Sequence, residues 1–319
     1  MIETDFVTGA AGFIGSNLVD RLLSLGHHVV GYDNFSTGQE RFLEAALRHP
    51  CFQLVRGDLL DFDSLAQAIH GCGMVFHLAA NADVRFGTEH PRTDLEQNTI
   101  ATFNLLESMR ESGTRIIVFA STSTIYGEAS TQPTPENYGP LLPISTYGAS
   151  KLACEAMIAS YAYTYGLRGL ILRLGNVVGS RSNHGVVPDF LKKLKQKPDS
   201  LEVLGDGTQS KSYIHISDCI SAIEIVVRNF TKSDTRVDAY NVSSADRVSV
   251  RRIAEIVLEE AGANGQIKTT GGVDGGRGWM GDVKVMQLSN QKLQALGWKD
   301  QYNSEMAIKQ AARELITQI

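Results

Sequence analysis

The chain has 319 residues, of which 43% are hydrophobic and 20% charged, a composition typical of a soluble globular protein rather than a disordered one. Its formal net charge is −5, and its lysines and arginines are scattered, which disfavours nucleic acid or an anionic membrane as partner. The four cysteines lie far apart without metal-ligand spacing, so we expect reduced thiols in a cytoplasmic protein that binds no metal. The sequence also lacks a secretion signal pattern and any apolar run long enough to span a membrane.

A glycine pattern lies between the first predicted strand and the first predicted helix. Gly9-x-x-Gly12-x-x-Gly15 would bring backbone N–H groups and the positive end of a helix to a pyrophosphate. The second predicted strand ends at Asp33, whose carboxylate can bind the ribose hydroxyls of an adenosine. Because Asp33 would repel a 2′-phosphate and no arginine directly follows it, the pattern favours NAD over NADP. A glycine-rich structural turn is the alternative, and this context disfavours it.

Strands and helices continue to alternate through the first half of the chain. We predict strands at 6–8, 28–32, 52–55, 74–80, 115–120 and 170–174, and a helix at 98–109. This rhythm is typical of an α/β fold with a doubly wound parallel sheet, the Rossmann architecture, in which ligands bind beyond the carboxyl ends of the strands. Asp58 follows the third strand, where its carboxylate could accept a hydrogen bond from an adenine amino group.

A tyrosine and a lysine stand four residues apart at the start of a long predicted helix, in Tyr147-x-x-x-Lys151, with Ser145 or Thr146 as the N-cap. Residues i and i+4 share one face of a helix, so the ammonium can lie near the phenol. A positive charge about 4 Å away, at an effective dielectric of about 20, lowers the phenol pKa by about three units. Such a tyrosine can accept a proton near neutral pH. The same pair occurs by chance on surface helices, and only the rest of the chain favours the catalytic interpretation.

The character of the sequence changes after Gly179. We predict a loop at 181–185, helices at 186–197, 217–227 and 250–261, a strand at 201–204, a turn at 205–207 and a glycine-rich loop at 271–278. We therefore expect a smaller, interleaved C-terminal lobe that binds substrate. The predicted division is an NAD-binding Rossmann domain at 1–178, to which part of 212–242 returns, and a substrate-binding lobe at 179–211 and 243–319.

In this order the glycine pattern, Asp33-Asn34-Phe35-Ser36, Thr122 and Tyr147-x-x-x-Lys151 resemble the extended short-chain dehydrogenase/reductases. Gly205-Asp206-Gly207-Thr208, Tyr213-Ile214-His215, and Arg277 before Gly281-Asp282 narrow the resemblance to nucleotide-sugar enzymes, in particular the UDP-glucose (UDP-galactose) 4-epimerases. In that family NAD⁺ takes the C4 hydride of a nucleotide hexose while the tyrosine takes the 4-hydroxyl proton. The 4-keto sugar is then reduced from its other face.

The resemblance implies NAD as cofactor, a nucleotide-diphosphate sugar as substrate, and a homodimer through the helices at 98–110 and 147–165. It assigns Tyr147 as the base, Lys151 as its electrostatic partner and ribose ligand, and Thr122 as the hydroxyl that binds the substrate oxygen. The implied cofactor-binding residues are Gly9, Gly12, Phe13, Ile14, Gly15, Asp33, Asn34, Asp58, Leu59, Leu78, Ala79, Ala80, Asn98, Tyr147 and Lys151. The implied substrate-binding residues are Asn176, Val186, Lys211, Arg277 and Met286.

Two positions depart from the family pattern or carry an alternative. Lys211 stands where the family usually has arginine, and a lysine lacks the bidentate fork that matches a diphosphate. Met286 aligns with the position that governs room for an N-acetyl group, and simple core packing is its alternative role.

The sequence leaves other functions open: a nucleotide-sugar 4,6-dehydratase, a decarboxylase, a 4-keto-reductase, or a non-catalytic NAD-binding protein. Intact Thr122, Tyr147 and Lys151 disfavour the last of these, because a non-catalytic protein needs no proton acceptor. Related dehydratases carry Asp-Glu directly after the threonine, and related decarboxylases carry a Glu. This chain has Ser123-Thr124 there, and neither hydroxyl readily acts as an acid or base near neutral pH. The resemblance therefore favours an epimerase, with the nucleotide and the sugar left open.

Overall fold

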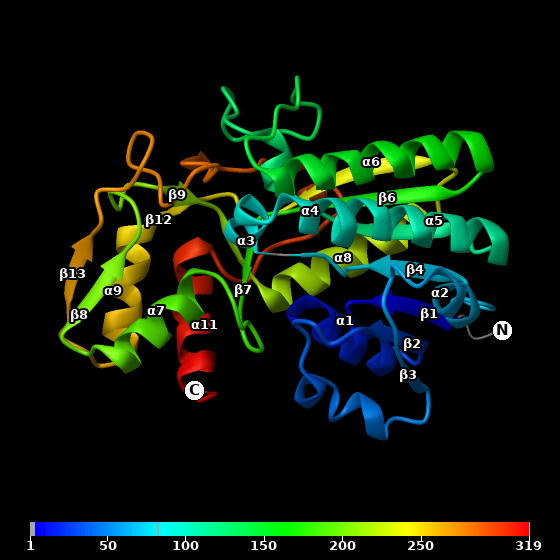
Figure 1. Ribbon diagram of the computed structural model, residues 1–319, viewed down its shortest axis with the longest axis horizontal. Coiled ribbons are helices and arrows are strands. Elements are labelled where there is room, and N and C mark those ends of the chain that lie inside the picture. The colour runs from blue at the N-terminus through cyan, green and yellow to red at the C-terminus, as the bar shows by residue number, and fades with distance from the viewer. Residues whose placement is uncertain (1–3, 82, 319) are drawn as a thin grey trace. The chain divides into compact units, whose positions relative to one another are not determined.

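The computed structural model describes residues 4–81 and 83–318 (Figure 1). The chain forms two compact units. Unit 1 comprises Met1–Ser121, Ala149–Leu172 and Val226–Ala239, and unit 2 comprises Thr122–Gly148, Arg173–Ile225 and Tyr240–Ile319. The assignment of an NAD-binding domain and a substrate-binding lobe to particular residue ranges remains a prediction.

A seven-stranded sheet combines five strands from the first half of the chain with two from the second half. Its strands are β1 (Thr4–Thr8), β2 (His28–Asp33), β3 (Phe52–Arg56), β4 (Met74–His77), β5 (Ile116–Thr122), β6 (Arg168–Leu174) and β11 (Val237–Val242). Their order is β11-β6-β5-β4-β1-β2-β3, and β3, β2, β1, β4 and β5 pair in parallel. The strand order reverses between β1 and β4, as in a doubly wound fold. The predicted α/β fold class is thereby confirmed.

The helices of unit 1 pack their apolar faces on this sheet. They are α1 (Phe13–Ser24), α2 (Phe62–Ala68), α3 (Val84–Glu89), α4 (Pro91–Asp94), α5 (Ala101–Ser112) and most of α6 (Thr146–Tyr165), with short helices η1 (Glu40–Leu43), η2 (Ala46–Arg48) and η3 (Leu95–Ile100). Buried side chains of α5 and α6 form a core with alternate residues of the strands, Phe6, Val75, Ile117 and Phe119 among them. Burying each such side chain contributes about 1.5–3 kcal/mol to the free energy of unfolding, relative to leaving it exposed. Helices α5 and α6 lie side by side (Figure 1), and the Tyr161 hydroxyl donates to Glu107 of α5 at 2.7 Å.

The structure corrects three predicted boundaries in unit 1. Strand β1 begins at Thr4 rather than residue 6, because the buried Asp5 has a partner: its Oδ2 lies 2.6 Å from Nδ1 of His27. Strand β4 ends at His77 rather than residue 80: the Leu78 N–H is shared between the carbonyl and the hydroxyl of Thr8, and the Ala79 N–H bonds to the Thr8 hydroxyl. The predicted helix at 98–109 begins as a π-helix, η3, and becomes α-helical only at Ala101.

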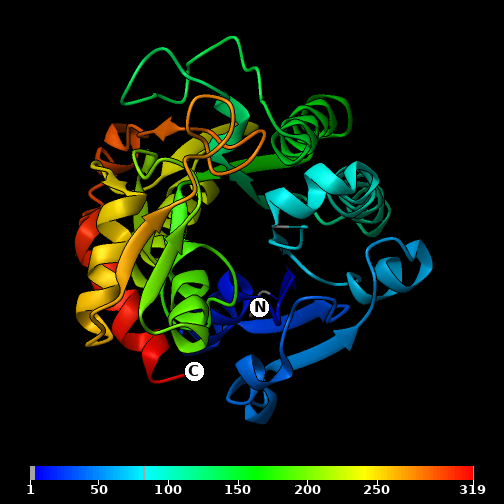
Figure 2. The same cartoon turned by 60° about the vertical axis from the view of Figure 1, so that its left-hand side comes forward.

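Unit 2 has its own core and three small sheets. It contains β7 (Asn176–Val178), β8 (Ser200–Val203), β9 (Ser210–Lys211), β10 (Tyr213–His215), β12 (Val248–Ser249), β13 (Gln266–Thr269) and β14 (Val285–Met286). Its helices are η4 (Ser123–Tyr126), α7 (Val186–Gln196), α9 (Val250–Glu260), α10 (Gln291–Gln294), α11 (Ser304–Ile316) and the start of α8 (Ile216–Thr231). Figure 2 shows β13 beside β8, its parallel partner.

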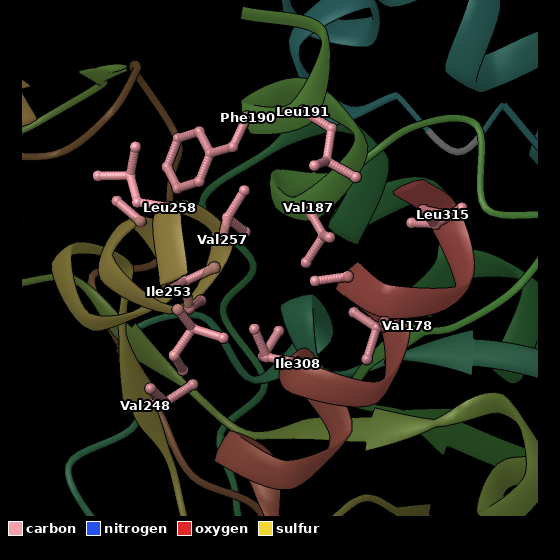
Figure 3. Packing of buried hydrophobic residues seen from close by; sticks show 14 of the residues in the cluster. Val178, Val187, Phe190, Leu191, Val248, Ile253, Val257, Leu258, Ile308 and Leu315 are labelled. Carbon is pink, nitrogen blue, oxygen red and sulfur yellow. The ribbon is translucent and has the colours of Figure 1, made fainter. Parts of the chain in front are cut away.

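The core of unit 2 lies between α7, α9 and α11. Figure 3 shows how Phe190 of α7, Val257 of α9 and Ile308 of α11 point toward one another, and all three are buried. Each helix thus turns one apolar face inward, as the spacing of its apolar residues predicts. None of the helices among the described residues combines the length and the apolarity needed to cross a membrane.

Candidate functional site

The glycine turn after β1 is packed too closely to accept side chains. A Cβ on Gly15 would lie 1.9 Å from the Gly9 carbonyl oxygen, and one on Gly9 would lie 2.8 Å from the Ala79 nitrogen. Gly9 also adopts a left-handed φ of +68°. Gly12 is the N-cap of α1, and Phe13, Ile14 and Gly15 form the first turn. The turn therefore presents backbone N–H groups and the positive helix end to a pyrophosphate, which fits the predicted NAD site.

The carboxylate of Asp33 is held in place at the end of β2. Its Oδ2 accepts the backbone N–H of Ala11 at 2.8 Å, and its Oδ1 accepts that of Phe35 at 2.8 Å. Burial raises the pKa of Asp33, while these two backbone hydrogen bonds act in the opposite direction. The bond to Ala11 ties the carboxylate to the glycine turn, so the groups predicted for ribose and pyrophosphate form one rigid arrangement.

The predicted adenine end of the site adjoins Asp33. Asn34 donates from Nδ2 to Oδ2 of Asp58 at 2.9 Å, and the Leu60 N–H donates to Oδ1 of Asp58 at 2.9 Å. Leu59 is buried, and its carbonyl accepts a hydrogen bond from Asn104 of α5 at 2.9 Å. The structure therefore brings Asn34, Asp58 and Leu59 together at the ends of β2 and β3.

The segment after β4 is fixed by the hydroxyl of Thr8. The N–H groups of Leu78 and Ala79 both donate to Thr8 Oγ1, each at 3.2 Å. These two donors occupy the acceptor capacity of the hydroxyl, so its proton points to Nδ1 of His77, 2.8 Å away. The predicted cofactor-binding residues 78–80 thus sit on the end of β1, directly beside the glycine turn.

His77 continues this chain of hydrogen bonds into η3 and α5. Its Nε2 lies 3.0 Å from Thr102 Oγ1, whose own proton goes to the Asn98 carbonyl at 2.6 Å. Nε2 must therefore carry the proton, and the ring is neutral. Burial and the nearby Lys151 lower the pKa of His77 to about 3, so it stays neutral in the physiological range.

Asn98 lies in the π-helix η3 and links three segments. Its Oδ1 accepts the Asn81 N–H at 2.9 Å, and its Nδ2 donates to Ser150 Oγ of α6 at 2.9 Å. Asn98 thereby connects the end of the 78–81 segment to the helix that carries Lys151. The structure places it among the predicted cofactor-binding residues, with its side chain bonded to protein groups.

Lys151 is buried at the end of β5. Its Nζ donates to the Ala120 carbonyl at 2.9 Å and lies 4.6 Å from the centroid of the Phe119 ring. Only 2% of the residue is exposed, and burial lowers the pKa of Lys151 to about 8, so it is predominantly an ammonium at neutral pH. Ser145 accepts the Gly148 N–H at 3.1 Å, as the predicted N-cap. Tyr147 is half-buried and lies four residues before Lys151 on the same helix face.

Thr122 ends β5, and its hydroxyl oxygen accepts a backbone hydrogen bond. Its Oγ1 accepts the backbone N–H of Thr124 at 3.2 Å and lies 3.2 Å from the Thr124 hydroxyl. Thr122 thereby caps η4, and either of the two threonine hydroxyls can be the donor between them. The two residues that follow it offer hydroxyl groups and no carboxylate.

In unit 2, the predicted cations Lys211 and Arg277 are both paired with acidic residues. Lys211 Nζ lies 2.6 Å from Asp282 Oδ1 and 5.5 Å from the centroid of the Trp279 ring. Arg277 Nη1 lies 2.7 Å from Glu128, and its Nε lies 3.1 Å from Asp274. Arg277 also donates to the Asp282 carbonyl at 3.1 Å, so both cations meet around Asp282.

The other predicted substrate residues lie in unit 2 as well. Met286 is buried in β14, where it pairs with Lys211 of β9. Asn176 begins β7 and donates from Nδ2 to the Ser212 carbonyl at 3.2 Å. Val186 is the first residue of α7 and is partly buried.

Several buried polar residues near Lys151 are absent from the predicted set, Asp94 among them, and two others lie on β4 and α6. One is His77, which no sequence motif distinguishes from an ordinary core histidine. The other is Glu155, whose Oε1 accepts the Ser121 hydroxyl at 2.5 Å. Its position four residues after Lys151, on the helix face of Tyr147, is a signal that the sequence does contain.

Comparison with known proteins finds similarity along the whole chain. Residues 6–243 match the NAD dependent epimerase/dehydratase family. The crystal structure of a UDP-galactose 4-epimerase is 42% identical, with a TM-score of 0.90 and 99% of each chain covered. A UDP-glucose 4-epimerase from Mycolicibacterium smegmatis is 31% identical over 305 residues, covering 92% of this chain and 93% of the relative. The structure of the Thermotoga maritima UDP-glucose 4-epimerase with UDP-glucose is 27% identical, with a TM-score of 0.87 and 99% of each chain covered.

Proposed function

This chain belongs to the NAD-dependent epimerase/dehydratase family, and we propose that it inverts C4 of a UDP-hexose, interconverting UDP-glucose and UDP-galactose. NAD is its cofactor. The glycine turn, in which Gly9 and Gly15 have no room for a Cβ, together with the fixed carboxylate of Asp33, fits the pyrophosphate and adenosine ribose of that cofactor. The observation that selects epimerisation within the family is the pair of hydroxyls at Ser123 and Thr124, because elimination or decarboxylation would require a carboxylate there.

The chemistry divides between the cofactor and three side chains. When bound, NAD supplies the acceptor and then the donor of the C4 hydride. The ammonium of Lys151 stabilises Tyr147 as a phenolate, which accepts the proton of the 4-hydroxyl group and becomes a neutral phenol. Thr122, whose oxygen is engaged by the Thr124 N–H, directs its proton to the same sugar oxygen. After the 4-keto sugar has rotated to present its other face, Tyr147 returns the proton to the oxygen at C4, and the reaction causes no net oxidation.

Arg277 and Lys211 bind the diphosphate of the substrate. Both are partly buried, with 17% and 21% of the side chain exposed, and both already hold carboxylates. A diphosphate therefore replaces Glu128 or Asp274 at the guanidinium rather than meeting an unpaired cation. The fork of Arg277 can hold two phosphate oxygens, and Lys211 acts as a point charge. Asn176 and Val186 contact the substrate beside them, and Met286 lies at the sugar.

The protein forms a homodimer through α5 and α6. These neighbouring helices carry exposed apolar and aromatic side chains, namely Ile100 at the end of η3, Phe103 of α5, and Tyr163 and Tyr165 of α6. Such side chains on adjacent helices support an interface between two copies.

A cytoplasmic location is supported by the four cysteines, all free thiols. Cell fractionation that finds the protein outside the cytoplasm would contradict it.

The product of the reaction tests the function. The purified protein, incubated with UDP-galactose, should form UDP-glucose of identical mass without sustained release of NADH, because the hydride leaves and returns within one turnover. Proton NMR and mass spectrometry measure both outcomes. A product lighter by one water indicates a dehydratase. Stoichiometric NADH indicates a net dehydrogenase.

Tyr147→Phe tests the proposed base. Turnover should fall by at least about a hundredfold, because the phenol that accepts the 4-hydroxyl proton is lost, while the NAD content of the purified protein stays unchanged. Tyr161→Phe is the matched control, since this tyrosine lies on the same helix and its hydroxyl bonds to Glu107 instead. If Tyr147→Phe turns over as fast as the control, the base is another group.

Arg277→Ala tests diphosphate recognition. The KM for UDP-galactose should rise at least about tenfold, the scale of a lost charge-assisted hydrogen bond, with NAD content unchanged. Arg313→Ala is the control, because Arg313 is likewise paired with a carboxylate, Glu260, at 2.7 Å. Equal losses of substrate and NAD binding, or no loss of either, would place Arg277 outside the substrate site.

Phe103→Glu tests the proposed dimer. A charge at this position would be buried without a partner in the interface, so sedimentation velocity should show a monomer where the unmodified protein sediments as a dimer. Leu47→Glu is the control, because Leu47 of η2 is 44% exposed and Phe103 is 46% exposed. A dimer that survives Phe103→Glu uses another surface.

A further inference from the structure

Helix α6 is attached to the end of β5 by two charged side chains on one face. Lys151 Nζ donates to the Ala120 carbonyl at 2.9 Å, and one turn later Glu155 Oε1 accepts the Ser121 hydroxyl at 2.5 Å. The lysine and the glutamate are 2% and 5% exposed. Two adjacent residues of one strand thus bind two successive turns of the helix that begins with Tyr147.

The buried ammonium of Lys151 requires a negative charge nearby, because burying an unpaired charge costs several kcal/mol. Besides Tyr147 itself, the titratable groups near it are Cys154 and Glu155 on α6, Asp94 on α4, and His77 on β4. His77 is neutral, and burial raises the pKa of the Cys154 thiol, which keeps it protonated at neutral pH. The compensating charges are therefore the carboxylates of Glu155 and Asp94.

These two carboxylates differ in how they are held. Asp94 Oδ1 accepts hydrogen bonds from Asn81 at 2.9 Å and Asn98 at 3.4 Å, on other segments of the chain. Glu155 belongs to the same helix as Lys151, one turn away, and Ser121 fixes it against the strand that also binds the ammonium. Burial lowers the pKa of Lys151 to about 8, and the charge of Glu155 acts against that shift.

We propose that Glu155 is a positioning residue for the reaction, whose carboxylate is the counter-ion that keeps Lys151 in its ammonium form beside Tyr147. This inference rests on the proposed function only where activity is the readout. Because its pKa is lowered to about 8, Lys151 is charged below about pH 8 and neutral above it. Removing the neighbouring negative charge lowers the pKa of Lys151 further, so the ammonium is lost at a lower pH.

The first experiment compares the pH dependence of kcat/KM for UDP-galactose between pH 6 and 9.5. Glu155→Gln keeps the volume and an acceptor for Ser121 but removes the charge, so the alkaline limb should move down by about one to two pH units. Ser121→Ala is the matched control: it removes the hydrogen bond and keeps the charge, and its limb should stay within a few tenths of a unit. Glu155→Asp keeps the charge, so its alkaline limb should lie close to that of the unmodified protein. An unmoved limb in Glu155→Gln overturns the proposal.

The second experiment needs no activity and separates this proposal from the proposed function. Thermal unfolding at pH 7 is measured for Glu155→Gln, Lys151→Met and the double variant. If the two charges compensate each other, each single variant leaves one charge buried without its partner. The double variant should then lose less stability than the sum of the losses in the two single variants. Additive losses overturn the proposal even where Glu155→Gln is too unstable for kinetics.

Discussion

The structure depends on one contact, the burial of the Lys151 ammonium against the carbonyl of Ala120 at the end of β5. That carbonyl follows directly after Phe119, the last residue of β5 that pairs with β4. The lysine occupies this position and thereby sets the height at which α6 lies along the sheet. Because Tyr147 precedes it by one helical turn, the same contact determines where the phenol stands relative to the strand end.

At the neighbouring strand ends, side chains also fix the backbone by hydrogen bonds, but these side chains are uncharged. Thr8, His77 and Thr102 form a chain of hydrogen bonds in which every donor has one acceptor, and the chain finishes at the Asn98 carbonyl. Such a fully satisfied network holds backbone in place without adding charge. This matters next to Lys151, since a protonated histidine there would compete for the same carboxylates. The uncharged hydrogen-bond network at the ends of β1 and β4 therefore leaves the carboxylates available to the charged lysine at the end of β5.

Much of the fold and part of the site follow from local patterns in the sequence. The alternation of strands and helices predicts the doubly wound sheet, and the glycine spacing with Asp33 predicts the turn that closes on Ala79. Features set by distant contacts were not predictable in this way. The Ala79 N–H just after β4 bonds to Thr8, 71 residues away, and Asn98 in the π-helix bonds to Ser150, 52 residues away. Glu155 was visible as a spacing, but only the bond to Ser121 shows that it is buried.

The acidic partners of Arg277 have a consequence for the selectivity of the proposed diphosphate site. A guanidinium that already binds Glu128 and Asp274 gains little from a single inorganic phosphate, because one anion merely displaces another. A ligand succeeds only if it offers several oxygens in the right geometry and brings further contacts with it. The abundant small anions of a cell are thereby poor competitors, and the electrostatic attraction that would draw in any polyanion is largely cancelled before the ligand arrives. Recognition at the proposed diphosphate site would consequently depend on the shape of the ligand as much as on its charge.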